Sequence, residues 1–358
     1  MKVGIACGGT GGHIFPGLAV AESLKKRGHS VVLWLSGRDV ENVSIGNNWN
    51  GDVVSIDISG IPAGFSFRSV VVAAQMLVSL LKCRRRMKND LPDVLLAMGS
   101  YASVGPVLAA RSLGVRIVLH EANAVPGRAI SFLSPFATAV AVAFEAVRKH
   151  LVHPRIVLTG FPVRHDPHAR FKEGGLRREL FTVLVAGGSQ GAHRLNEIAS
   201  AALCRLHSEG IPVQAVHLAG VNDEIVVRQI YEKAGIPHVV FGFLKDMGKA
   251  YNSADLAVTR SGAGTCAEIS AYAVPALLVP LPSARRNHQM ANARALAAMD
   301  GVDIIEEKDL SVEWLADYID RCCRDQEKLD RMKNALKTMV VPNAGERLAD
   351  LVEKVGCP

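Results

Sequence analysis

The sequence predicts an α/β protein made of two doubly wound domains, each built on a parallel sheet. Short apolar strands alternate with helical stretches along the whole chain, as in strand–helix–strand units. The first strand runs directly into the glycine-rich segment Gly8–His13, which precedes a helix. A similar segment, Gly187–Ala192, follows another apolar strand near the middle of the chain. Two segments of this kind, each following an apolar strand, indicate two domains of similar build.

The N-terminal half supplies the first series of expected elements. A strand at Lys2–Cys7 leads through Gly8–His13 into a helix at Pro16–Lys26, which ends before Gly28, a residue type common just past a helix end. Further strands are expected at Val31–Leu35, Val94–Met98, Ile117–His120, Ala139–Ala143 and Ile156–Thr159. Their continuous apolar character is typical of strands covered on both faces of a parallel sheet.

The second series begins with a strand at Phe181–Ala186 and a helix from Leu195 to His207. Further strands are expected at Val213–Leu218, Val239–Phe241, Asp255–Thr259 and Ala276–Val279. From Val312 onward the pattern is helical, with a break at Pro342. The same alternation as in the first half therefore predicts a second parallel sheet.

We place the domain boundary near Pro162, because a proline restricts the conformation of the residue before it. The expected domains are 1–162 and 163–342, with the last helix, 343–358, joining the first domain. Ligands of open α/β sheets bind beside the carboxyl ends of the strands, so two such domains facing each other would form a cleft.

Length and charge limit the class of protein. The chain has 358 residues, more than a single hydrophobic core usually holds, which indicates two domains. Hydrophobic residues make up 49% of it, a fraction typical of folded proteins. The first 160 residues hold 17 lysines and arginines against 9 acidic residues, whereas the remainder is close to neutral. This excess favours a polyanionic partner or an anionic membrane surface, although scattered solvated lysines would also produce it.

The cysteines and the apolar runs indicate the cellular compartment in which the protein is expected. Seven cysteines lie without a CxxC pair or regular spacing, which is typical of reduced thiols in the cytosol. The chain enters its first strand directly, so no signal peptide is expected, and no uncharged apolar run reaches the ~18–20 residues that span a bilayer. The usual metal-site patterns are also absent from the sequence. We expect a metal-independent protein, soluble or peripheral to a membrane.

One segment suggests where a membrane would be met. Ser69–Leu81 is thirteen residues without charge, and five basic residues follow within seven positions, among them Arg84, Arg85 and Arg86. Thirteen residues are too few to cross a bilayer, so a buried helix is the default interpretation. The basic cluster supports an alternative, in which the end of the helix rests against anionic headgroups.

The glycine-rich segments predict phosphate binding. Glycines let the backbone approach a ligand closely, and the helix that follows offers free amides and the positive end of its dipole. A dinucleotide fingerprint is incomplete, because Ile14 occupies the place of its third glycine, and this disfavours an oxidoreductase. His13, at the end of the first segment, can move a proton near neutral pH.

A third small-residue segment, Arg260–Glu268, follows an expected strand and opens another helix. Glu268 lies about one turn into that helix. A carboxylate there could accept hydrogen bonds from the two vicinal hydroxyls of a ribose, or could simply stabilise the helix start through the dipole. The loop 280–292 then carries donors and acceptors suited to a sugar, namely Arg285, Arg286, His288, Gln289 and Asn292.

Together these motifs resemble the MurG family, the peptidoglycan N-acetylglucosaminyltransferases of the GT-B fold. The matching segments run in order along nearly the whole chain: Gly8–Ala21, Gly99–Ser103, His120–Asn123, Gly160–Arg164, Gly187–Ala192, Arg260–Glu268 and Gln289–Asn292. Ser100 departs from the pattern, because the family usually has glycine before the tyrosine. The resemblance implies two Rossmann-like, doubly wound domains facing across a cleft.

The resemblance also implies the activity. It is the inverting, metal- and cofactor-independent transfer of GlcNAc from UDP-GlcNAc to the C4 hydroxyl of MurNAc in undecaprenyl-diphospho-MurNAc-pentapeptide (lipid I), which gives lipid II. The family works on the cytoplasmic face of the bacterial plasma membrane. The implied partners are therefore an anionic membrane surface and other cell-wall and division proteins, and no nucleic acid.

Site residues follow from the resemblance position by position. The implied donor-site residues are Thr10, Gly11, Gly12, Asn123, Arg164, Ser189, Leu244, Ala263, Gly264, Thr265, Cys266, Ala267, Glu268, Gln289 and Asn292. Ser189 would contact phosphate, Leu244 the uracil edge and Glu268 the ribose. His13 matches the general base proposed for the family. Tyr101, with Arg84, Arg85 and Arg86, would face the acceptor and the membrane.

Three other functions are compatible with the sequence. Another GT-B transferase would use a different nucleotide sugar or lipid acceptor. A sugar-nucleotide epimerase would release a free product without any lipid acceptor. A non-catalytic scaffold of the wall-synthesis machinery would bind the donor without turnover.

Overall fold

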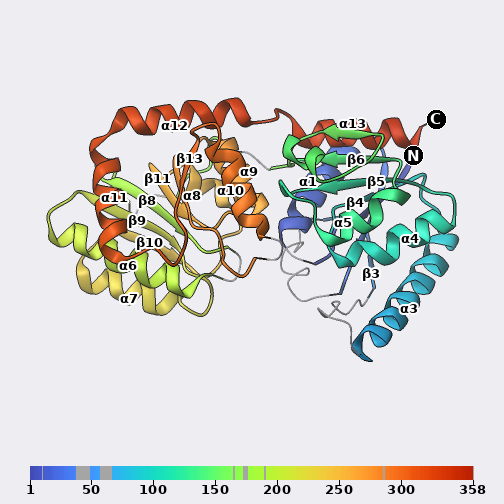
Figure 1. The fold of residues 1–358 in the computed structure, drawn as a ribbon, viewed down its shortest axis with the longest axis horizontal. Coiled ribbons are helices and arrows are strands. Elements are labelled where there is room, and N and C mark those ends of the chain that lie inside the picture. The colour runs from blue at the N-terminus through green and yellow to red at the C-terminus, as the bar shows by residue number, and fades with distance from the viewer. Residues whose placement is uncertain are drawn as a thin grey trace. The chain divides into compact units, whose positions relative to one another are not determined.

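The computed structural model describes residues 1–9, 11–37, 49–56, 67–163, 166–171, 176–188, 191–284 and 287–357, with side chains omitted over 67–75. The chain divides into two compact units, shown in Figure 1. Unit 1 comprises Met1–Arg164 together with Val341–Pro358, and unit 2 comprises His165–Val340.

Unit 1 is built on a seven-stranded parallel sheet in the order β3-β2-β1-β4-β5-β6-β7. Its strands are β1 (Lys2–Ala6), β2 (Ser30–Leu35), β3 (Asp52–Ser55), β4 (Val94–Ala97), β5 (Arg116–Glu121), β6 (Ala139–Val142) and β7 (Ile156–Leu158). The four central strands are almost wholly buried, which explains their continuous apolar character.

Helices cover both faces of this sheet. They are α1 (Gly11–Lys26), α3 (Phe67–Asn89), α4 (Val104–Ser112), α5 (Arg128–Leu133), α13 (Ala344–Gly356) and the short 3-10 helices η2 (Tyr101–Ser103), η3 (Ser134–Phe136) and η4 (Glu145–Lys149). One core cluster joins the sheet to α1 and α13, and another joins it to α3, α4 and α5. Arg27, the residue after α1, donates to Asp350 (2.6 Å) and Glu353 (2.8 Å) of α13, which fixes the last helix to unit 1.

Unit 2 repeats the design with a six-stranded parallel sheet in the order β10-β9-β8-β11-β12-β13. Its strands are β8 (Phe181–Ala186), β9 (Val213–Leu218), β10 (His238–Phe241), β11 (Leu256–Thr259), β12 (Ala276–Leu278) and β13 (Val302–Ile304). Its helices are α6 (His193–Ser208), α7 (Glu224–Ala234), α8 (Met247–Tyr251), α9 (Ala263–Tyr272), α10 (His288–Ala297), α11 (Val312–Arg324) and α12 (Gln326–Met339). The largest core cluster packs α6, α7 and α11 against the sheet.

Each sheet has one point where the strand order reverses. In unit 1 it lies between β1 and β4, which we call the first switch point. In unit 2 it lies between β8 and β11, the second switch point. Connections leave such neighbouring strands in opposite directions, so a crevice opens beside their carboxyl ends, where α/β proteins bind ligands.

Four details differ from the sequence-based expectations. Helix α1 begins at Gly11 instead of Pro16, so Gly11, Gly12 and His13 form its first turn. Among the described residues of Gly8–His13, Gly9 has a positive φ (125°). Helix α6 likewise begins two residues early, at His193. The strands β3 and β13 were not predicted; both are short edge strands, which carry a weak apolar pattern.

Candidate active site

The first switch point brings two glycine-containing segments together. Gly9 follows β1, and Gly99 and Ser100 follow β4. A Cβ on Gly9 would lie 2.6 Å from Ser100 Oγ, and one on Gly99 would lie 3.5 Å from His13 Nε2. Ser100 has φ 68° and ψ 162°, a region that normally only glycine occupies. Its hydroxyl accepts a hydrogen bond from the amide of Ala102 at the start of η2, where Tyr101 also lies.

His13 is partly exposed in the first turn of α1, beside Gly99. Desolvation, and secondarily the charge of nearby His120, lower the pKa of His13 to about 4. His120, at the end of β5, is fully buried, and its Nε2 lies 3.0 Å from the carbonyl oxygen of Gly160. Both imidazoles are therefore neutral at pH 7, the form of His13 that can accept a proton.

Asn123 is held beside the carboxyl end of β5 by a buried carboxylate. Glu121 is 3% exposed and its Oε1 accepts from the amide (2.8 Å) and side-chain nitrogen (3.0 Å) of Asn123. Its Oε2 accepts from the amide of Gly127 at 2.8 Å. Three hydrogen bonds to one carboxylate shape the whole 123–127 turn. Asn123 was expected at the site from the sequence, whereas this role of Glu121 was not.

At the second switch point, two helices begin at the carboxyl ends of neighbouring strands. α6 follows β8 and α9 follows β11, and neither N-cap residue, Ala192 or Gly262, makes a side-chain capping bond. The first intrahelical bonds come from the amides of Asn196 and Cys266. Within the described part of the chain, the three amides before each of these have no acceptor. Free amides at the positive end of a helix dipole favour an anion, so the starts of α6 and α9 are a candidate site for a diphosphate.

Glu268 lies one turn after the free amides of α9. Burial raises the pKa of Glu268 to about 7, and a hydrogen bond from the Tyr251 hydroxyl to its Oε2 (2.9 Å) acts in the opposite direction. Cys266 on the same helix is fully buried and its amide bonds to the carbonyl of Gly262, so it packs in the core. From the sequence, all residues from Ala263 to Glu268 were expected to line the donor site.

The loop before α10 is tied to the second switch point. The Ser261 hydroxyl donates to the carbonyl of Gln289 (2.9 Å), whose side-chain Oε1 accepts from the amide of Leu281 (2.9 Å). Asn292 is fully buried, and its amide group donates to the carbonyl of Ser261 at 3.1 Å. These bonds hold Gln289 beside the start of α9. A direct sugar contact by Asn292 stays a prediction.

A buried ion pair braces the same region. Arg260, 6% exposed, donates to the carbonyl of Val279 (3.2 Å) and pairs with Glu307. The pair joins the ends of β11 and β12 to the segment after β13. Neither partner was singled out for this role from the sequence, because the residues lie 47 positions apart.

Three expected donor residues, Thr10, Arg164 and Ser189, lie outside the described residues. Leu244 is partly exposed after β10, and the following helix α8 packs on α9. Its assignment to the uracil edge stays a prediction.

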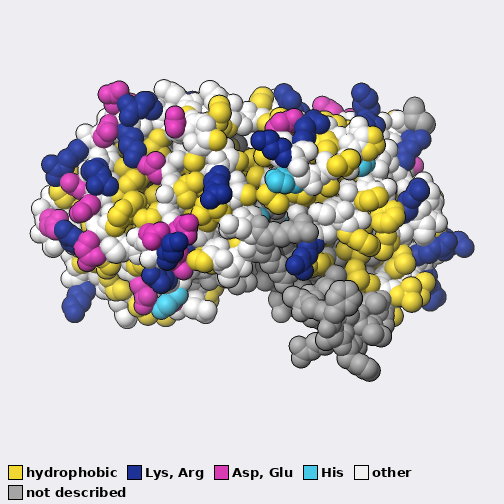
Figure 2. Space-filling model, viewed as in Figure 1, with side chains coloured by type: hydrophobic (Ala, Val, Ile, Leu, Met, Phe, Trp, Pro, Cys, Tyr) yellow, Lys and Arg dark blue, Asp and Glu magenta, His cyan; other side chains and the backbone are white. Residues whose placement is uncertain are grey.

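Helix α3 presents an apolar and basic surface, which we call the α3 surface. Leu77 (56% exposed), Val78 (50%) and Leu81 (56%) face away from the core, whereas Cys83 and Met87 pack beneath the helix. This corrects the default interpretation of a buried helix at these positions. Figure 2 shows hydrophobic side chains beside lysines and arginines in the region where Figure 1 draws α3. No helix among the described residues is long and apolar enough to cross a bilayer.

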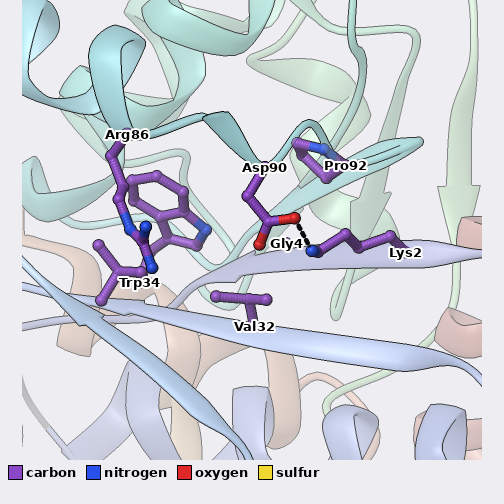
Figure 3. A pocket seen from close by; sticks show the side chains of 8 residues that line it. Lys2, Gly4, Val32, Trp34, Arg86, Asp90 and Pro92 are labelled. Carbon is purple, nitrogen blue, oxygen red and sulfur yellow. Dashed lines mark hydrogen bonds and ion pairs between the residues drawn. The ribbon is translucent and has the colours of Figure 1, made fainter. Parts of the chain in front are cut away.

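The three arginines of this helix have different surroundings. Arg84 donates to the hydroxyl of Ser112 in α4 at 3.0 Å. Arg86 lies beside Trp34 at a small cavity in which Asp90 pairs with Lys2 (Figure 3). The volume of that cavity, about 10 Å³, admits one water molecule, so it is not a nucleotide-sugar site. Arg85 is exposed.

Comparisons with known proteins agree with this geometry. Residues 3–142 match the glycosyltransferase family 28 N-terminal domain, and residues 182–349 match its C-terminal domain. The UDP-N-acetylglucosamine--N-acetylmuramyl-(pentapeptide) pyrophosphoryl-undecaprenol N-acetylglucosamine transferase of Geotalea uraniireducens is 34% identical, over 98% of this chain and 97% of the relative. The Bacillus subtilis enzyme of the same name is 31% identical over 99% of both chains.

Solved structures give the same picture. The crystal structure of Acinetobacter baumannii MurG matches with a TM-score of 0.78 and 30% identity, covering 99% of each chain. A UDP-GlcNAc 2-epimerase from Neisseria meningitidis matches with a TM-score of 0.68 at 12% identity, which shows a shared fold alone. The fold and these matches thus define a two-domain glycosyltransferase of the GT-B type. The chain belongs to glycosyltransferase family 28 and is an N-acetylglucosaminyltransferase.

Proposed function

We propose that this enzyme transfers GlcNAc from UDP-GlcNAc to the C4 hydroxyl of MurNAc in lipid I, with inversion, releasing UDP and lipid II. The relatives from Geotalea uraniireducens and Bacillus subtilis are named for this transfer. The assignment of the UDP-GlcNAc site rests mainly on the position of Glu268, one turn after the free amides of α9.

The second switch point holds the donor. The amides at the starts of α6 and α9 bind the diphosphate, and they stabilise the negative charge that develops on UDP as it leaves. Glu268 accepts hydrogen bonds from the ribose hydroxyls, and the backbone of Leu244 meets the uracil edge. Gln289 reads the hydroxyls of GlcNAc. Arg164 and Ser189 add donors to the diphosphate.

His13 is the base that takes the proton from the attacking hydroxyl. It is neutral at pH 7, because its pKa is lowered to about 4. A base this weak accepts a proton only after the attacking oxygen has become acidic, which places the transfer late in bond formation. The acceptor would then lie against the first switch point, near Tyr101 and Ser100.

The decisive assay combines labelled UDP-GlcNAc with a lipid I analogue in EDTA. We expect lipid II to form, because helix dipoles and side chains replace a metal ion in this mechanism. Free sugar or an epimer without lipid product would favour an epimerase. In a parallel reaction with UDP-glucose, UDP release from UDP-glucose but not from UDP-GlcNAc would favour a different transferase. UDP binding without any turnover would favour a scaffold.

Two variants test the assigned roles. His13→Ala should lower kcat by about 10²–10⁴-fold at saturating acceptor, the usual contribution of a general base. Glu268→Ala should raise the KM for UDP-GlcNAc and leave the KM for the acceptor unchanged. Near-normal turnover of the first variant, or unchanged donor affinity of the second, would remove the respective assignment.

The α3 surface is the contact with an anionic cytoplasmic membrane, where the lipid acceptor resides. Exposed Leu77, Val78 and Leu81 would enter the interface, while the basic residues after them meet the headgroups. The first 160 residues also carry the positive excess of the chain.

Vesicle sedimentation tests this contact. Replacing Arg85 and Lys88 with serine should weaken binding to anionic vesicles and leave binding to neutral ones unchanged. Replacing Arg331 and Lys337, exposed on α12, is the matched control and should change neither. Equal losses in both variants would show a general charge effect and no specific surface.

A further inference from the structure

A buried tyrosine holds one oxygen of Glu268. Tyr251, the last residue of α8, is 2% exposed, and its hydroxyl lies 2.9 Å from Glu268 Oε2. The tyrosine donates this hydrogen bond, because an ionised carboxylate can only accept. Within the described part of the chain, no other group donates to the carboxylate. Oε1 therefore remains available to a ligand.

The position of Tyr251 is fixed from two sides. Its ring stacks on that of Tyr272, with centroids 5.3 Å apart, and the Tyr272 hydroxyl accepts from the amide of Asp166 (3.1 Å). The next residue, Asn252, donates to the carbonyls of Asp166 (2.8 Å) and Ala169 (3.0 Å). Because α8 is anchored at both places, the Tyr251 hydroxyl cannot turn away without breaking packing.

The carboxylate needs this partner. A protonated carboxyl group keeps fewer acceptor sites and cannot receive two hydroxyl donors as well as an ionised one. Burial raises the pKa of Glu268 to about 7, and the Tyr251 hydrogen bond is the influence that lowers it. The titratable groups around this pair are Tyr272 and Cys266 from α9, with Asp166 and Asp246 beside the Tyr272 hydroxyl.

We propose that Tyr251 is a positioning residue for donor binding, holding Oε2 of Glu268 so that Oε1 meets the paired ribose hydroxyls of the nucleotide. This inference rests on the proposed function, since it needs Glu268 to contact the ribose. Tyr251 touches no substrate itself, so its loss should affect donor binding and leave the chemical step intact.

The test is the pH dependence of UDP-GlcNAc affinity, measured by calorimetry between about pH 6 and 9. The wild-type affinity should fall below about pH 7, as Glu268 becomes protonated. In Tyr251→Phe the lost hydrogen bond should move this profile up by about one pH unit, so that affinity at pH 7 drops ~5-fold and recovers at high pH. The donor KM should rise similarly, with kcat little changed.

Tyr231→Phe is the matched control. Tyr231 is also fully buried in unit 2, and its hydroxyl bonds to His217 Nδ1 (2.9 Å) away from Glu268. This variant should show a similar loss of thermal stability with the wild-type pH profile. A Tyr251→Phe profile that is unshifted, or lowered equally at every pH, would overturn the proposal.

Two further proteins separate the possible failures. Glu268→Gln cannot ionise, so it should bind weakly and without the pH dependence. If it binds like the wild type, the ribose contact of the proposed function fails; if it binds weakly while Tyr251→Phe is unshifted, only the role of Tyr251 fails. Should Tyr251→Phe not fold, a fluorotyrosine at position 251, a stronger donor, should move the profile down, and no movement would overturn the proposal.

Discussion

The two switch points share a topology and differ in how their loops are held. At the first, the ends of β1 and β4 meet through small uncharged residues, with Gly9 against the side chain of Ser100 and the buried Ser103 hydroxyl donating to the carbonyl of Ala6 (3.3 Å). At the second, the ends of β8 and β11 are braced by buried polar groups, including the Arg260–Glu307 pair and the amide of Asn292. One sheet design therefore supports strand ends held mainly by small uncharged residues in unit 1 and strand ends braced by a buried ion pair in unit 2.

The difference has a physical consequence. Buried hydrogen bonds and ion pairs fix loop positions, because leaving such a group without its partner costs far more than the bond contributes when made. A contact between small residues constrains its neighbours only through volume. Substitutions at the second switch point should accordingly be more costly than the corresponding ones at the first.

The largest effect is expected at Gly191. Its φ is 76°, and an added Cβ would overlap the backbone carbonyl oxygen of Ala219, which cannot move independently. Gly191→Ala should destabilise unit 2 by about 3 kcal/mol or more and abolish UDP-GlcNAc binding. Gly188→Ala is the control: φ is 92° there but no atom of the described residues lies within 4 Å of an added Cβ, so the cost should be only ~1 kcal/mol. Equal costs in denaturant unfolding would contradict the steric argument.

Next is the buried ion pair. Glu307→Gln leaves the guanidinium of Arg260, whose side chain is 8% exposed, without its charge partner. We expect a loss of ~3 kcal/mol in the free energy of unfolding and weaker donor binding. Glu306→Gln breaks the exposed neighbouring pair with Lys308 and should leave both quantities unchanged. A small effect of Glu307→Gln would show that the second switch point does not depend on this brace.

Acid should weaken both units, through His120 together with His13 in unit 1 and through His217 in unit 2. Burial lowers the pKa of His120 to about 4 and that of His217 to about 3, from an ordinary 6.5. Between these values the unfolded chain binds more protons than the folded one, so stability is full above pH 6.5 and falls as pH drops toward 4. Each histidine should contribute a slope of ~1.4 kcal/mol per pH unit. Urea unfolding at several pH values measures this slope. The variant His217→Gln should remove the contribution of unit 2 to the pH dependence and leave that of unit 1.

The smallest effect tests the first switch point. Ser100 occupies a glycine region of backbone space, so Ser100→Gly should stabilise unit 1 by ~1 kcal/mol. Gly9→Ala should cost ~2 kcal/mol in the wild type and less in the Ser100→Gly background, because the obstructing atom is Ser100 Oγ. A double-mutant cycle gives this coupling. Strict additivity would mean that the contact between the two residues is not what constrains Gly9.

The sequence by itself determined the sheet strands other than β3 and β13, and the glycine-rich segments. Continuous apolar runs such as Phe181–Ala186 and Val213–Leu218 are local signals of buried parallel strands, and both were found with those bounds. The position of Glu268 one turn into a helix followed equally from local spacing.

Only the tertiary structure decided which residues meet across the sheet edge. Tyr251 reaches Glu268, and Arg260 reaches Glu307, because parallel strands bring the ends of distant segments to one edge, and no local pattern encodes such pairs. The start of α1 at Gly11 was also decided by packing on the sheet, since glycine is a poor helix former. The exposure of Leu77 and Leu81 depends in the same way on which side of α3 faces α4.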